Sequence, residues 1–407
     1  MINIAILGFG VVGSGVAEVI AMNSDTIERH LGDKLAVKKI LDLREFPDSP
    51  FASLVTHEAS EVFDDEDISV VVETIGGARV AYEFTKKALS SGKSVVTSNK
   101  ELVATHGPEL MEIARENGCL YLYEAAVGGG IPIIRPLHRC MAANKIVRIA
   151  GIVNGTTNYI LTNMRVAGIS YDEALSQAQA KGYAEQNPTA DVEGIDAQRK
   201  LSILSSIALE GQYVSHEEIH TEGISKITLE DIDLAYKIGC SCKLLAVFDN
   251  RADEKPYVFV APHFVRNTSV LYPVEDVFNA IMVEGNALGE AMFYGRGAGK
   301  LPTASAVVGD VLEACLPPED NAYNHTWFSF PDAGRVTADY EDIITGAVAK
   351  GAPGDLDILF DTFKAYETEK ACDDNECSAI FIKSISHRDI DKLIKNVQGG
   401  TWIHYME

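Results

Sequence analysis

The sequence predicts an α/β protein in which a doubly wound parallel sheet is joined to an α+β domain and a small C-terminal α+β module. Short apolar runs alternate with helical patterns over the first third of the chain, and a glycine turn follows the first run. This alternation is typical of βαβ units and a parallel sheet. From about Ile146 the apolar runs become longer and show polar alternation, which indicates a second kind of domain.

The expected elements follow in chain order. In the first part, strands are expected at Ile2–Leu7, Leu35–Leu41, Val70–Thr74, Ser94–Thr97 and Cys119–Tyr123, and helices at Val11–Met22, Ala81–Ser90 and Met111–Glu116. In the second part, strands are expected at Ile146–Val153 and Tyr257–Val265, with helices at Ile195–Leu209 and Leu229–Leu244. The last part is expected to hold strands Ser378–Lys383 and Thr401–Tyr405 and a helix at Asp389–Asn396.

These elements suggest three domains. A dinucleotide-binding domain is expected over residues 1–134, with residues 301–318 returning to it as a helix. A catalytic and dimerisation domain is expected over 135–300, and a C-terminal module over 319–407. A chain of 407 residues is too long for one ordinary core, so more than one packed unit is needed.

Composition excludes several classes of protein. A formal charge of −24 argues against a nucleic-acid or anionic-membrane partner, which would need a basic face. Apolar runs stay below the roughly 18 residues of a membrane span, and the first strand begins at Ile2, which leaves no leader. Seven cysteines, with Cys240 near Cys242 and Cys372 near Cys377, lack a second pair at zinc-finger spacing, which predicts reduced thiols. A cytoplasmic protein is therefore expected.

The first motif is a glycine turn between a strand and a helix, Gly8-x-Gly10-x-x-Gly13. Its glycines permit a tight turn and a close backbone approach to a pyrophosphate, which the N-terminus of the following helix would bind. A turn that serves packing alone is the alternative. Because strand, helix and position agree, we expect the site to bind NAD or NADP.

The end of the second strand is expected to bind the adenosine ribose. Asp42 is placed to accept hydrogen bonds from the ribose hydroxyls, which favours NAD. Arg44, two residues later, could pair with a 2′-phosphate instead. The sequence leaves the choice between NAD and NADP open.

One expected helix, Gly194–Glu210, carries a charged pair on its apolar face. The apolar stripe consists of Ile203, Leu204, Ile207 and Ala208. Continued backward by helical steps, the same face reaches Lys200 and Asp196. A buried lysine suits proton donation to a carbonyl oxygen, so the pair is a catalytic candidate. An i,i+4 acid–base pair on a solvated face of the helix is the alternative.

Three other segments contain candidate ligands. The loop before that helix gathers Glu185 and Asp191 beside a proline turn, where they could bind an ammonium group or only be solvated. The segment Tyr123–Pro132 contains three glycines, which let carbonyl groups point toward a cation or form a hinge. His216–His220 matches H-E-x-x-H, but it is short and lacks a helical context, so no zinc site is expected there.

Over residues 1 to about 318 the chain resembles homoserine dehydrogenase. The resemblance rests on motifs in a fixed order, each of them modest evidence alone: Gly8–Gly13, Thr97-Ser98-Asn99-Lys100, Tyr123–Ile134, Gly151–Leu161, Gly182–Lys200 and Tyr294–Gly299. It implies the reversible NAD- or NADP-dependent reduction of L-aspartate 4-semialdehyde to L-homoserine, a small-molecule reaction in threonine, methionine and isoleucine biosynthesis.

The resemblance also implies roles for residues. Lys200 would transfer the proton, with Asp196 beside it and Lys100 as the second candidate. Substrate would be bound by Glu185, Asp191, Gly182 and Tyr183. Cofactor would be bound by Gly8, Gly10, Val11, Val12, Gly13, Asp42, Arg44, Thr74, Ser98, Lys100 and Gly297. A monovalent cation, typically sodium, would be held through carbonyl oxygens of Glu124, Val127, Gly129 and Ile131.

The resemblance further implies a homodimer or higher homo-oligomer, and it weakens at the C-terminus. Many relatives carry an effector-binding ACT domain there, but the glycine-plus-apolar helix start of the effector site is not found in residues 319–407. We therefore expect a degenerate ACT-like module, which supports assembly as readily as it binds an effector. Two alternatives remain: a non-catalytic NAD(P)-sensing regulator, and a different semialdehyde dehydrogenase that would need a nucleophilic cysteine.

Overall fold

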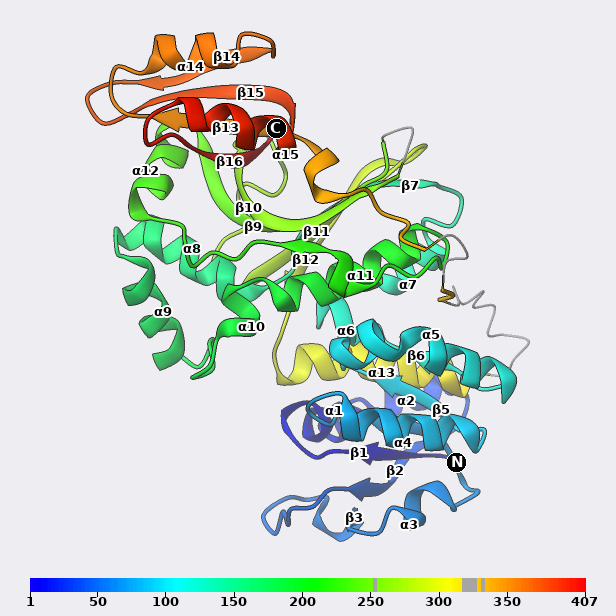
Figure 1. Ribbon diagram of the computed structural model, residues 1–407. Helices are drawn as coiled ribbons and strands as arrows, with labels where there is room; N and C mark the ends of the chain where they lie inside the picture. Colours follow the sequence, from blue (N-terminus) through cyan, green and yellow to red (C-terminus); the bar gives the residue numbers. More distant parts are fainter. Residues whose placement is uncertain (252–254, 317–327, 331–333) are drawn as a thin grey trace. The chain divides into compact units, whose positions relative to one another are not determined.

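A computed structural model describes residues 1–251, 255–316, 328–330 and 334–407 (Figure 1). The chain divides into two compact units. Unit 1 contains residues 1–145, 202–216 and 293–334, and unit 2 contains 146–201, 217–292 and 335–407. The expected division into three domains stays a prediction, and its boundary at 318/319 lies outside the described residues.

The sheet of unit 1 is parallel throughout, and its strand order is β3-β2-β1-β4-β5-β6. These strands are β1 (Ile2–Leu7), β2 (Leu35–Leu41), β3 (Val55–Thr56), β4 (Ile68–Glu73), β5 (Ser94–Thr97) and β6 (Tyr121–Leu122). The order reverses at β1, because β2 lies on one side of it and β4 on the other. Ligands of such sheets bind at the carboxyl ends of the strands where this reversal occurs.

Helices cover both faces of this sheet, as a doubly wound fold requires (Figure 1). The helices of unit 1 are α1 (Val11–Met22), α2 (Ser24–Leu31), α3 (Ser60–Phe63), α4 (Arg79–Ser90), α5 (Lys100–Glu116), α6 (Ala125–Gly128), α7 (Ile134–Arg139) and α13 (Lys300–Cys315). Apolar residues of α1 and α13 pack with alternate residues of β1 and β4 in one buried cluster, which includes Val16, Val307, Ile6 and Val72. The helix expected within 301–318 is thus part of unit 1.

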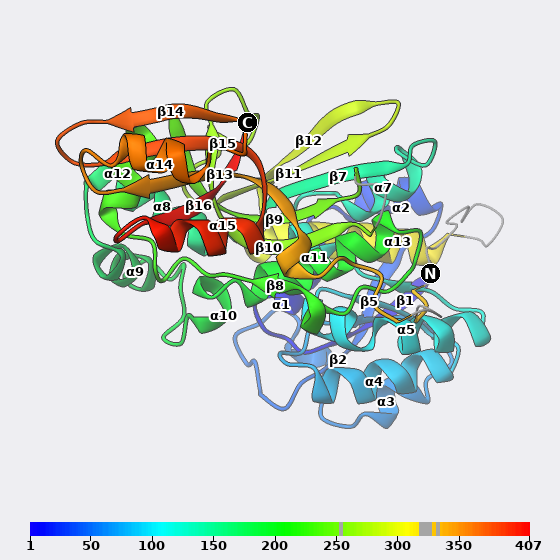
Figure 2. The same cartoon turned by 45° about the horizontal axis from the view of Figure 1, so that its top comes forward.

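Unit 2 is built on a mixed sheet with the order β12-β11-β7-β9-β10-β16-β13-β15-β14, and β8 also pairs with β10. Its strands are β7 (Ile146–Ile152), β8 (His220–Thr221), β9 (Cys240–Asp249), β10 (Tyr257–Arg266), β11 (Phe278–Gly285), β12 (Gly289–Arg296), β13 (Ile344–Gly351), β14 (Thr368–Asp373), β15 (Ser378–Ser386) and β16 (Thr401–Met406). The parallel pairing of β10 with β16 joins the C-terminal strands to the same sheet (Figure 2).

The helices of unit 2 follow the same chain order. They are α8 (Gly155–Ala167), α9 (Tyr171–Ala180), α10 (Thr189–Val192), α11 (Ile195–Ala208), α12 (Leu229–Lys237), α14 (Leu356–Thr362) and α15 (His387–Leu393). The division between the units passes through α11 after Leu201 and through β12 after Met292. Helices α8 and α12 pack on β9.

Two expected helices differ from the structure. The helix expected at Leu229–Leu244 ends at Lys237, because Gly239 adopts a φ of +75° and strand β9 then begins at Cys240. The helix expected at Met111–Glu116 begins earlier, at Lys100, where the side chain of Asn99 caps it by accepting a hydrogen bond from the Leu102 amide. The other expected elements are confirmed to within a few residues at their ends.

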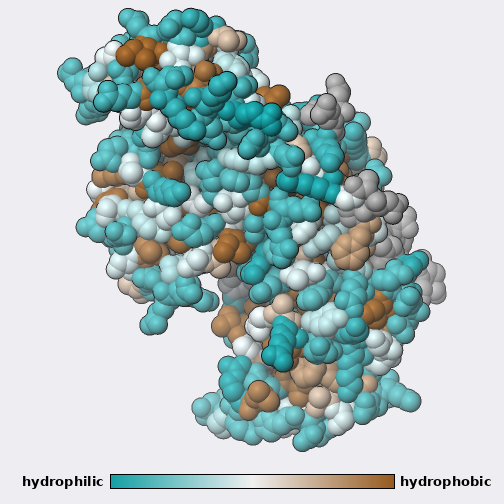
Figure 3. Space-filling view, in the orientation of Figure 1, coloured by the Kyte–Doolittle hydropathy of each residue, from teal (hydrophilic) through white to brown (hydrophobic). Residues whose placement is uncertain are grey.

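Hydrophilic residues cover most of the face shown in Figure 3, and apolar residues are scattered among them in small groups. Within the described ranges, none of the helices combines the length and the hydropathy that a membrane span requires.

Candidate functional site

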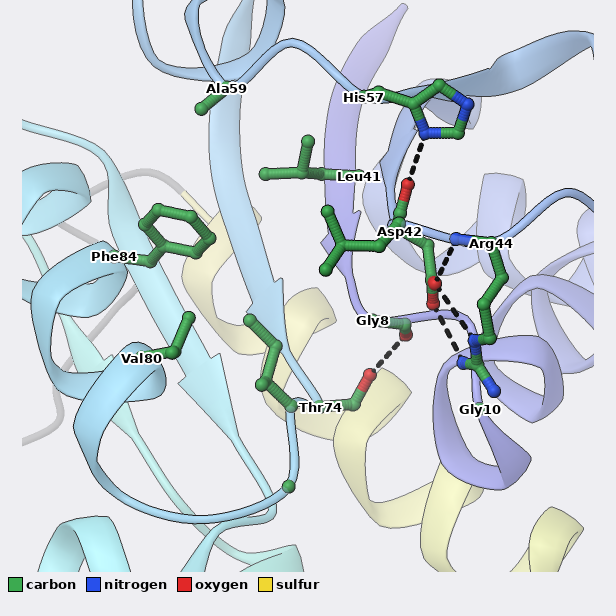
Figure 4. A pocket seen from close by; sticks show the side chains of 13 residues that line it. Gly8, Gly10, Leu41, Asp42, Arg44, His57, Ala59, Thr74, Val80 and Phe84 are labelled. Carbon is green, nitrogen blue, oxygen red and sulfur yellow. Dashed lines mark hydrogen bonds and ion pairs between the residues drawn. The ribbon is translucent and has the colours of Figure 1, made fainter.

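A pocket of about 500 Å³ opens at the carboxyl ends of β1, β2 and β4 in unit 1. Gly8 follows β1, Asp42 follows β2 and Thr74 follows β4, so three neighbouring strands each deliver one expected cofactor-binding residue to it. The Thr74 hydroxyl donates to the Gly8 carbonyl over 2.7 Å and ties two of these strand ends together (Figure 4). The pocket therefore lies where the strand order reverses.

Close packing requires glycine at two positions of the glycine turn. Gly8 adopts a φ of +86°, and a Cβ at Gly13 would lie 2.0 Å from the Gly8 carbonyl oxygen. Gly10 is different, because a Cβ there would meet nothing within 4 Å. Gly10 precedes the first turn of α1, to which Val11, Val12 and Gly13 belong. Unoccupied space at Gly10 beside a helix N-terminus is what a bound pyrophosphate needs.

Asp42 and Arg44 form one charged unit at the rim of this pocket (Figure 4). The Arg44 guanidinium donates from Nε to Oδ1 of Asp42 over 3.0 Å and from an Nη to Oδ2 over 2.9 Å. The amide of Phe9 also donates to Oδ2, over 2.6 Å. Arg44 is the main cause that lowers the pKa of Asp42 to about 2. The carboxylate is thus charged at neutral pH and can accept from ribose hydroxyls.

The pocket also contains residues that the sequence reasoning missed. The Nδ1–H group of His57 donates to the Asp42 carbonyl oxygen over 2.6 Å. Val80 and Phe84, both on α4, face Leu41 across the pocket in Figure 4. This apolar slot suits a flat base such as adenine. No local signal marks these residues, because they come from a loop and a helix far from the glycine turn.

Ser98 and Lys100 lie directly after β5, beside a buried carboxyl group. Glu73 is fully buried at the end of β4, where it accepts from the Thr97 hydroxyl over 2.5 Å and from the Ile75 amide over 2.6 Å. Burial raises the pKa of Glu73 to about 7. Lys100 is the first residue of α5. Neither Ser98 nor Lys100 lines the pocket at the glycine turn.

The lysine and aspartate predicted on one helix face are paired and buried in unit 2. Lys200 is 7% exposed and Asp196 is 4% exposed. The Lys200 ammonium donates to Oδ2 of Asp196 and to the carbonyl of Val153, each over 2.7 Å. The alternative of a solvated i,i+4 pair is therefore wrong for this position.

Asn154 joins this pair to a second acid. Its amide nitrogen donates to Oδ1 of Asp191 over 2.7 Å and to Oδ2 of Asp196 over 2.9 Å. Its amide oxygen accepts from the Thr157 amide and caps α8. Asn154 thus links the carboxylate that is bonded to Lys200 to the carboxylate of Asp191. Asn154 enters the sequence-based prediction only within the motif Gly151–Leu161. An Asn at the start of a helix is nevertheless a recognisable capping signal.

The other substrate-binding candidates lie on the loop between α9 and α10. Tyr183 is 44% exposed, and its carbonyl accepts from the Thr156 hydroxyl over 2.7 Å. The Glu185 carbonyl accepts from the Gln179 amide over 3.1 Å, and Glu185 itself is exposed. Gly182 takes a φ of +74°, which explains the glycine. These bonds join the loop to α8 and α9, and the side chain of Glu185 is exposed to solvent.

The expected cation ligands surround a short helix of unit 1. Both carboxylate oxygens of Glu124 accept amide hydrogens from the start of α7, at 2.6 to 2.8 Å, so only its carbonyl oxygen fits the expected role. Helix α6 ends at Gly128 and is followed by Gly129, whose φ is +57°. A Cβ at Gly129 would lie 2.1 Å from the Gly297 carbonyl oxygen. Backbone carbonyls at a helix C-terminus are hard oxygen ligands, which suits a monovalent cation.

Two negative predictions concern metals and thiols. His216–Glu218 is a single 3₁₀ turn and His220 begins β8, so the H-E-x-x-H pattern does not form the helix that a zinc site needs. All seven cysteines are free thiols.

A dinucleotide pocket at the switch point of a parallel sheet, in a chain that also buries a lysine against an aspartate, defines a nicotinamide-dependent oxidoreductase. Residues 8–124 match the family model for the NAD binding domain of homoserine dehydrogenase, and residues 132–312 match the model for homoserine dehydrogenase itself. The chain belongs to the homoserine dehydrogenase family.

Individual relatives agree over most of the chain. Homoserine dehydrogenase of Bacillus subtilis is 42% identical over 315 residues, which cover 76% of this chain and 72% of that one. The Pseudomonas aeruginosa enzyme is 42% identical over 336 residues, or 82% and 77% of the two chains. The crystal structure of the Thiobacillus denitrificans enzyme matches with a TM-score of 0.89 and 33% identity, over 100% of this chain and 98% of that one. A hyperthermophilic archaeal enzyme in complex with NADPH matches with a TM-score of 0.66 and 30% identity, over 78% and 98%.

Proposed function

We propose that this chain catalyses the reversible NAD(P)-dependent reduction of L-aspartate 4-semialdehyde to L-homoserine, with Lys200 as the proton-transferring group. The observation that carries the proposal is the buried Lys200 ammonium, which is bonded to Asp196 in a chain of this family. The nicotinamide, when bound, supplies the hydride for reduction and accepts it in oxidation. Lys200 donates the accompanying proton to the aldehyde oxygen and takes it back from the alcohol in the reverse direction.

The carboxylates of unit 2 hold the substrate in this proposal. Asp191 and Asp196 share the amide of Asn154, which fixes the orientation of both groups. An α-ammonium group would be attracted by two fixed carboxylates, and Glu185, Gly182 and Tyr183 complete the loop around it. Lys100 is the second candidate for proton transfer.

The cofactor is bound by the pocket of unit 1. Gly10, Val11, Val12 and Gly13 present the start of α1 to the pyrophosphate. Asp42 accepts from the ribose, while Arg44 stands beside it to meet a 2′-phosphate. Thr74 holds the glycine turn through its bond to the Gly8 carbonyl. Ser98 and Gly297 are the remaining residues proposed to bind the cofactor. The pair Asp42 and Arg44 allows NAD and NADP to be used.

The assay that tests this function follows reduced nicotinamide by absorbance, with homoserine as substrate and NAD⁺ or NADP⁺ as oxidant. We expect turnover that needs homoserine and does not need phosphate. Phosphate-dependent oxidation of L-aspartate 4-semialdehyde, without turnover of homoserine, would favour the rival semialdehyde dehydrogenase. That reaction needs an activated thiol, whereas burial raises the pKa of Cys119 to about 11. Binding of NADPH without any turnover would favour a non-catalytic sensor.

A monovalent cation is proposed at the carbonyl oxygens of Glu124, Val127, Gly129 and Ile131. Its role would be to hold the end of α6 against the loop at Gly297. If this is correct, replacing sodium by tetramethylammonium at constant ionic strength should lower activity or the midpoint of thermal unfolding. Equal values in the two salts would contradict a bound cation.

A homodimer is proposed as well. Strand β12 is at one end of the sheet order; its Met292 is 43% exposed, and Leu288 in the turn before the strand is 54% exposed. An edge strand with exposed apolar side chains is suited to pairing with a second copy. Light scattering on the purified chain should give twice the 44.1 kDa mass. The module 319–407 is proposed to support this assembly, and localisation in the cytoplasm is part of the same proposal.

A further inference from the structure

The turn between β14 and β15 gathers two thiols and a carboxylate. Sγ of Cys372 lies 3.9 Å from Sγ of Cys377 and donates to Oδ2 of Asp374 over 3.2 Å. One ligand atom from each of the three residues lies within 4.8 Å of the others. Cys372 is buried, while Asp374 and Cys377 are partly exposed. Among the described residues this is the one such group of histidine, cysteine and acidic side chains.

From this geometry we infer a binding site for a borderline-soft divalent cation of the zinc class, with Cys372, Cys377 and Asp374 as its ligands. Zinc binds thiolate sulfur at about 2.3 Å, so two sulfurs on a tetrahedral ion lie about 3.8 Å apart. The observed 3.9 Å matches that spacing without rearrangement of the turn. The three side chains supply two sulfurs and one oxygen, and a water molecule would complete the tetrahedron.

The backbone of the turn holds the carboxylate in place. Oδ1 of Asp374 accepts from the amide of Glu376 over 2.9 Å and from the amide of Cys377 over 3.3 Å. The Asp374 amide in turn donates to the Cys377 carbonyl over 3.1 Å. The oxygen that faces the sulfurs is therefore Oδ2, and its orientation is set by bonds to the other oxygen. Such support of a metal ligand is typical of built sites.

The charges around the turn favour a cation despite one lysine. Lys237, at the end of α12, forms ion pairs with Asp374 and with Glu376, the latter at 3.1 Å. With both thiols ionised, two thiolates and two carboxylates outnumber the single ammonium. A divalent cation would reduce this excess of negative charge, and its binding would release the two thiol protons to solvent. Lys237 can stay on Glu376 when Oδ2 of Asp374 turns to the metal.

The site has a structural role and lies apart from the residues proposed for catalysis. Strand β14 is the last strand in the order of the unit 2 sheet, and it pairs only with β15 along that order. A metal bound by Cys372 and Cys377 would tie the end of β14 to the start of β15. An edge hairpin closed in this way resists fraying. We therefore expect the cation to stabilise the C-terminal strands and to leave turnover unchanged.

The test uses the full-length chain, reduced and freed of metal, and then titrated with Co²⁺ or Zn²⁺. We expect about one Zn²⁺ per chain after gel filtration, and thiolate-to-cobalt charge-transfer absorption with the visible bands of a tetrahedral ion. Cys372→Ser and Cys377→Ser should lose both signals, and Asp374→Asn should bind more weakly. The matched control is Cys140→Ser, since Cys140 is an exposed thiol of unit 1; it should bind as the wild type does.

Thiol alkylation gives a second readout, because bound Zn²⁺ should protect two thiols in the wild type and in Cys140→Ser. The same homoserine turnover in Cys372→Ser as in the wild type would support a structural role. The inference is overturned if the cysteine variants retain as much metal as the wild type, or if the wild type retains none. It is also overturned if the purified chain carries a Cys372–Cys377 disulfide that excludes the metal.

Discussion

In the proposed function, Asp42 and Arg44 serve both forms of the cofactor. The bidentate pair keeps Asp42 ionised, with a pKa of about 2, and partly neutralises its charge. A ribose hydroxyl can then donate to Asp42, while a 2′-phosphate meets the cation before it meets the carboxylate. Removal of the guanidinium leaves an uncompensated negative charge at this position.

Arg44→Ala should therefore weaken NADPH binding more than NADH binding. We expect the Kd of NADPH to rise about tenfold or more, and that of NADH to change about threefold at most, because only the phosphate is repelled by Asp42. Fluorescence titration of the two reduced cofactors measures both constants. Arg29→Ala, on the exposed side of α2, is the control. Equal weakening for both cofactors would contradict this role of Arg44.

Glu73 is a second residue whose charge is controlled by burial. Its pKa in the folded chain is about 7, above the ordinary 4.5, so the folded state binds its proton more tightly than the unfolded state. Stability is therefore lost as the pH rises from about 4.5 to about 7, where Glu73 is charged when unfolded and protonated when folded. Above that window the loss is complete.

Glu73→Gln should remove this loss. Relative to the wild type, the variant should gain on the order of 2–3 kcal/mol between pH 5 and pH 8, since the neutral amide carries no charge to bury. Unfolding of the variant and of the wild type at both pH values measures this difference in stability. Other groups with a pKa of about 7, such as Asp310, contribute equally to the two proteins and cancel in the comparison. Glu58→Gln, at an exposed position, is the control. The same pH dependence in Glu73→Gln and wild type would refute the assignment.

At the scale of elements, packing and the proposed cofactor binding depend on different glycines of the turn between β1 and α1. A Cβ at Gly13 would meet the Gly8 carbonyl at 2.0 Å, whereas one at Gly10 would meet nothing within 4 Å. The two substitutions add the same methyl group to the same turn. Their effects should differ in kind, because only one of the methyl groups has a neighbour in the protein.

Gly13→Ala should destabilise unit 1, by about 1–3 kcal/mol or more, since backbone must move. Gly10→Ala should keep the wild-type unfolding midpoint and lose cofactor affinity by about tenfold or more, because its methyl group occupies space needed by the pyrophosphate. Thermal unfolding and NADPH titration measure the two effects. Unchanged NADPH affinity in Gly10→Ala would show that the turn does not approach the cofactor.

Elements with a strong local signal could be predicted from the sequence. The helix Val11–Met22 and the strand Leu35–Leu41 agree with the structure in full, because a glycine turn precedes the helix and polar residues flank the strand. The helix expected at Leu229–Leu244 was wrong after Lys237, since an apolar run can continue from helix into strand without a change in pattern. Gly239, with its positive φ, was the available signal.

Parts of the site could not be predicted because they depend on contacts between distant segments. Lys200 and Asp196 follow from helical spacing, but Asn154 bonds to Asp191 and to Asp196 across 37 and 42 residues of sequence. Val80 and Phe84 enter the cofactor pocket from α4 for the same reason. At the C-terminus, Asp374 stands between two cysteines that spacing alone assigns to ordinary thiols, and only the turn geometry brings the three together.

At the scale of the whole molecule, the C-terminal strands belong to the sheet of unit 2. The pairing of His263 with His404 joins β10 to β16, so the C-terminal strands extend the sheet that carries β7. Val153, which accepts from Lys200, directly follows β7. The match to the Thiobacillus denitrificans enzyme covers the whole of this chain, including these C-terminal strands.

The most direct test of the account compares Lys200→Ala with the wild type in homoserine oxidation. We predict that kcat falls by about 10²–10⁴-fold, because the proton acceptor is lost, while the Kd of NADPH stays within about twofold. Lys364→Ala removes a lysine whose side chain is 74% exposed and should behave as the wild type. Wild-type turnover in a folded Lys200→Ala chain would contradict the account.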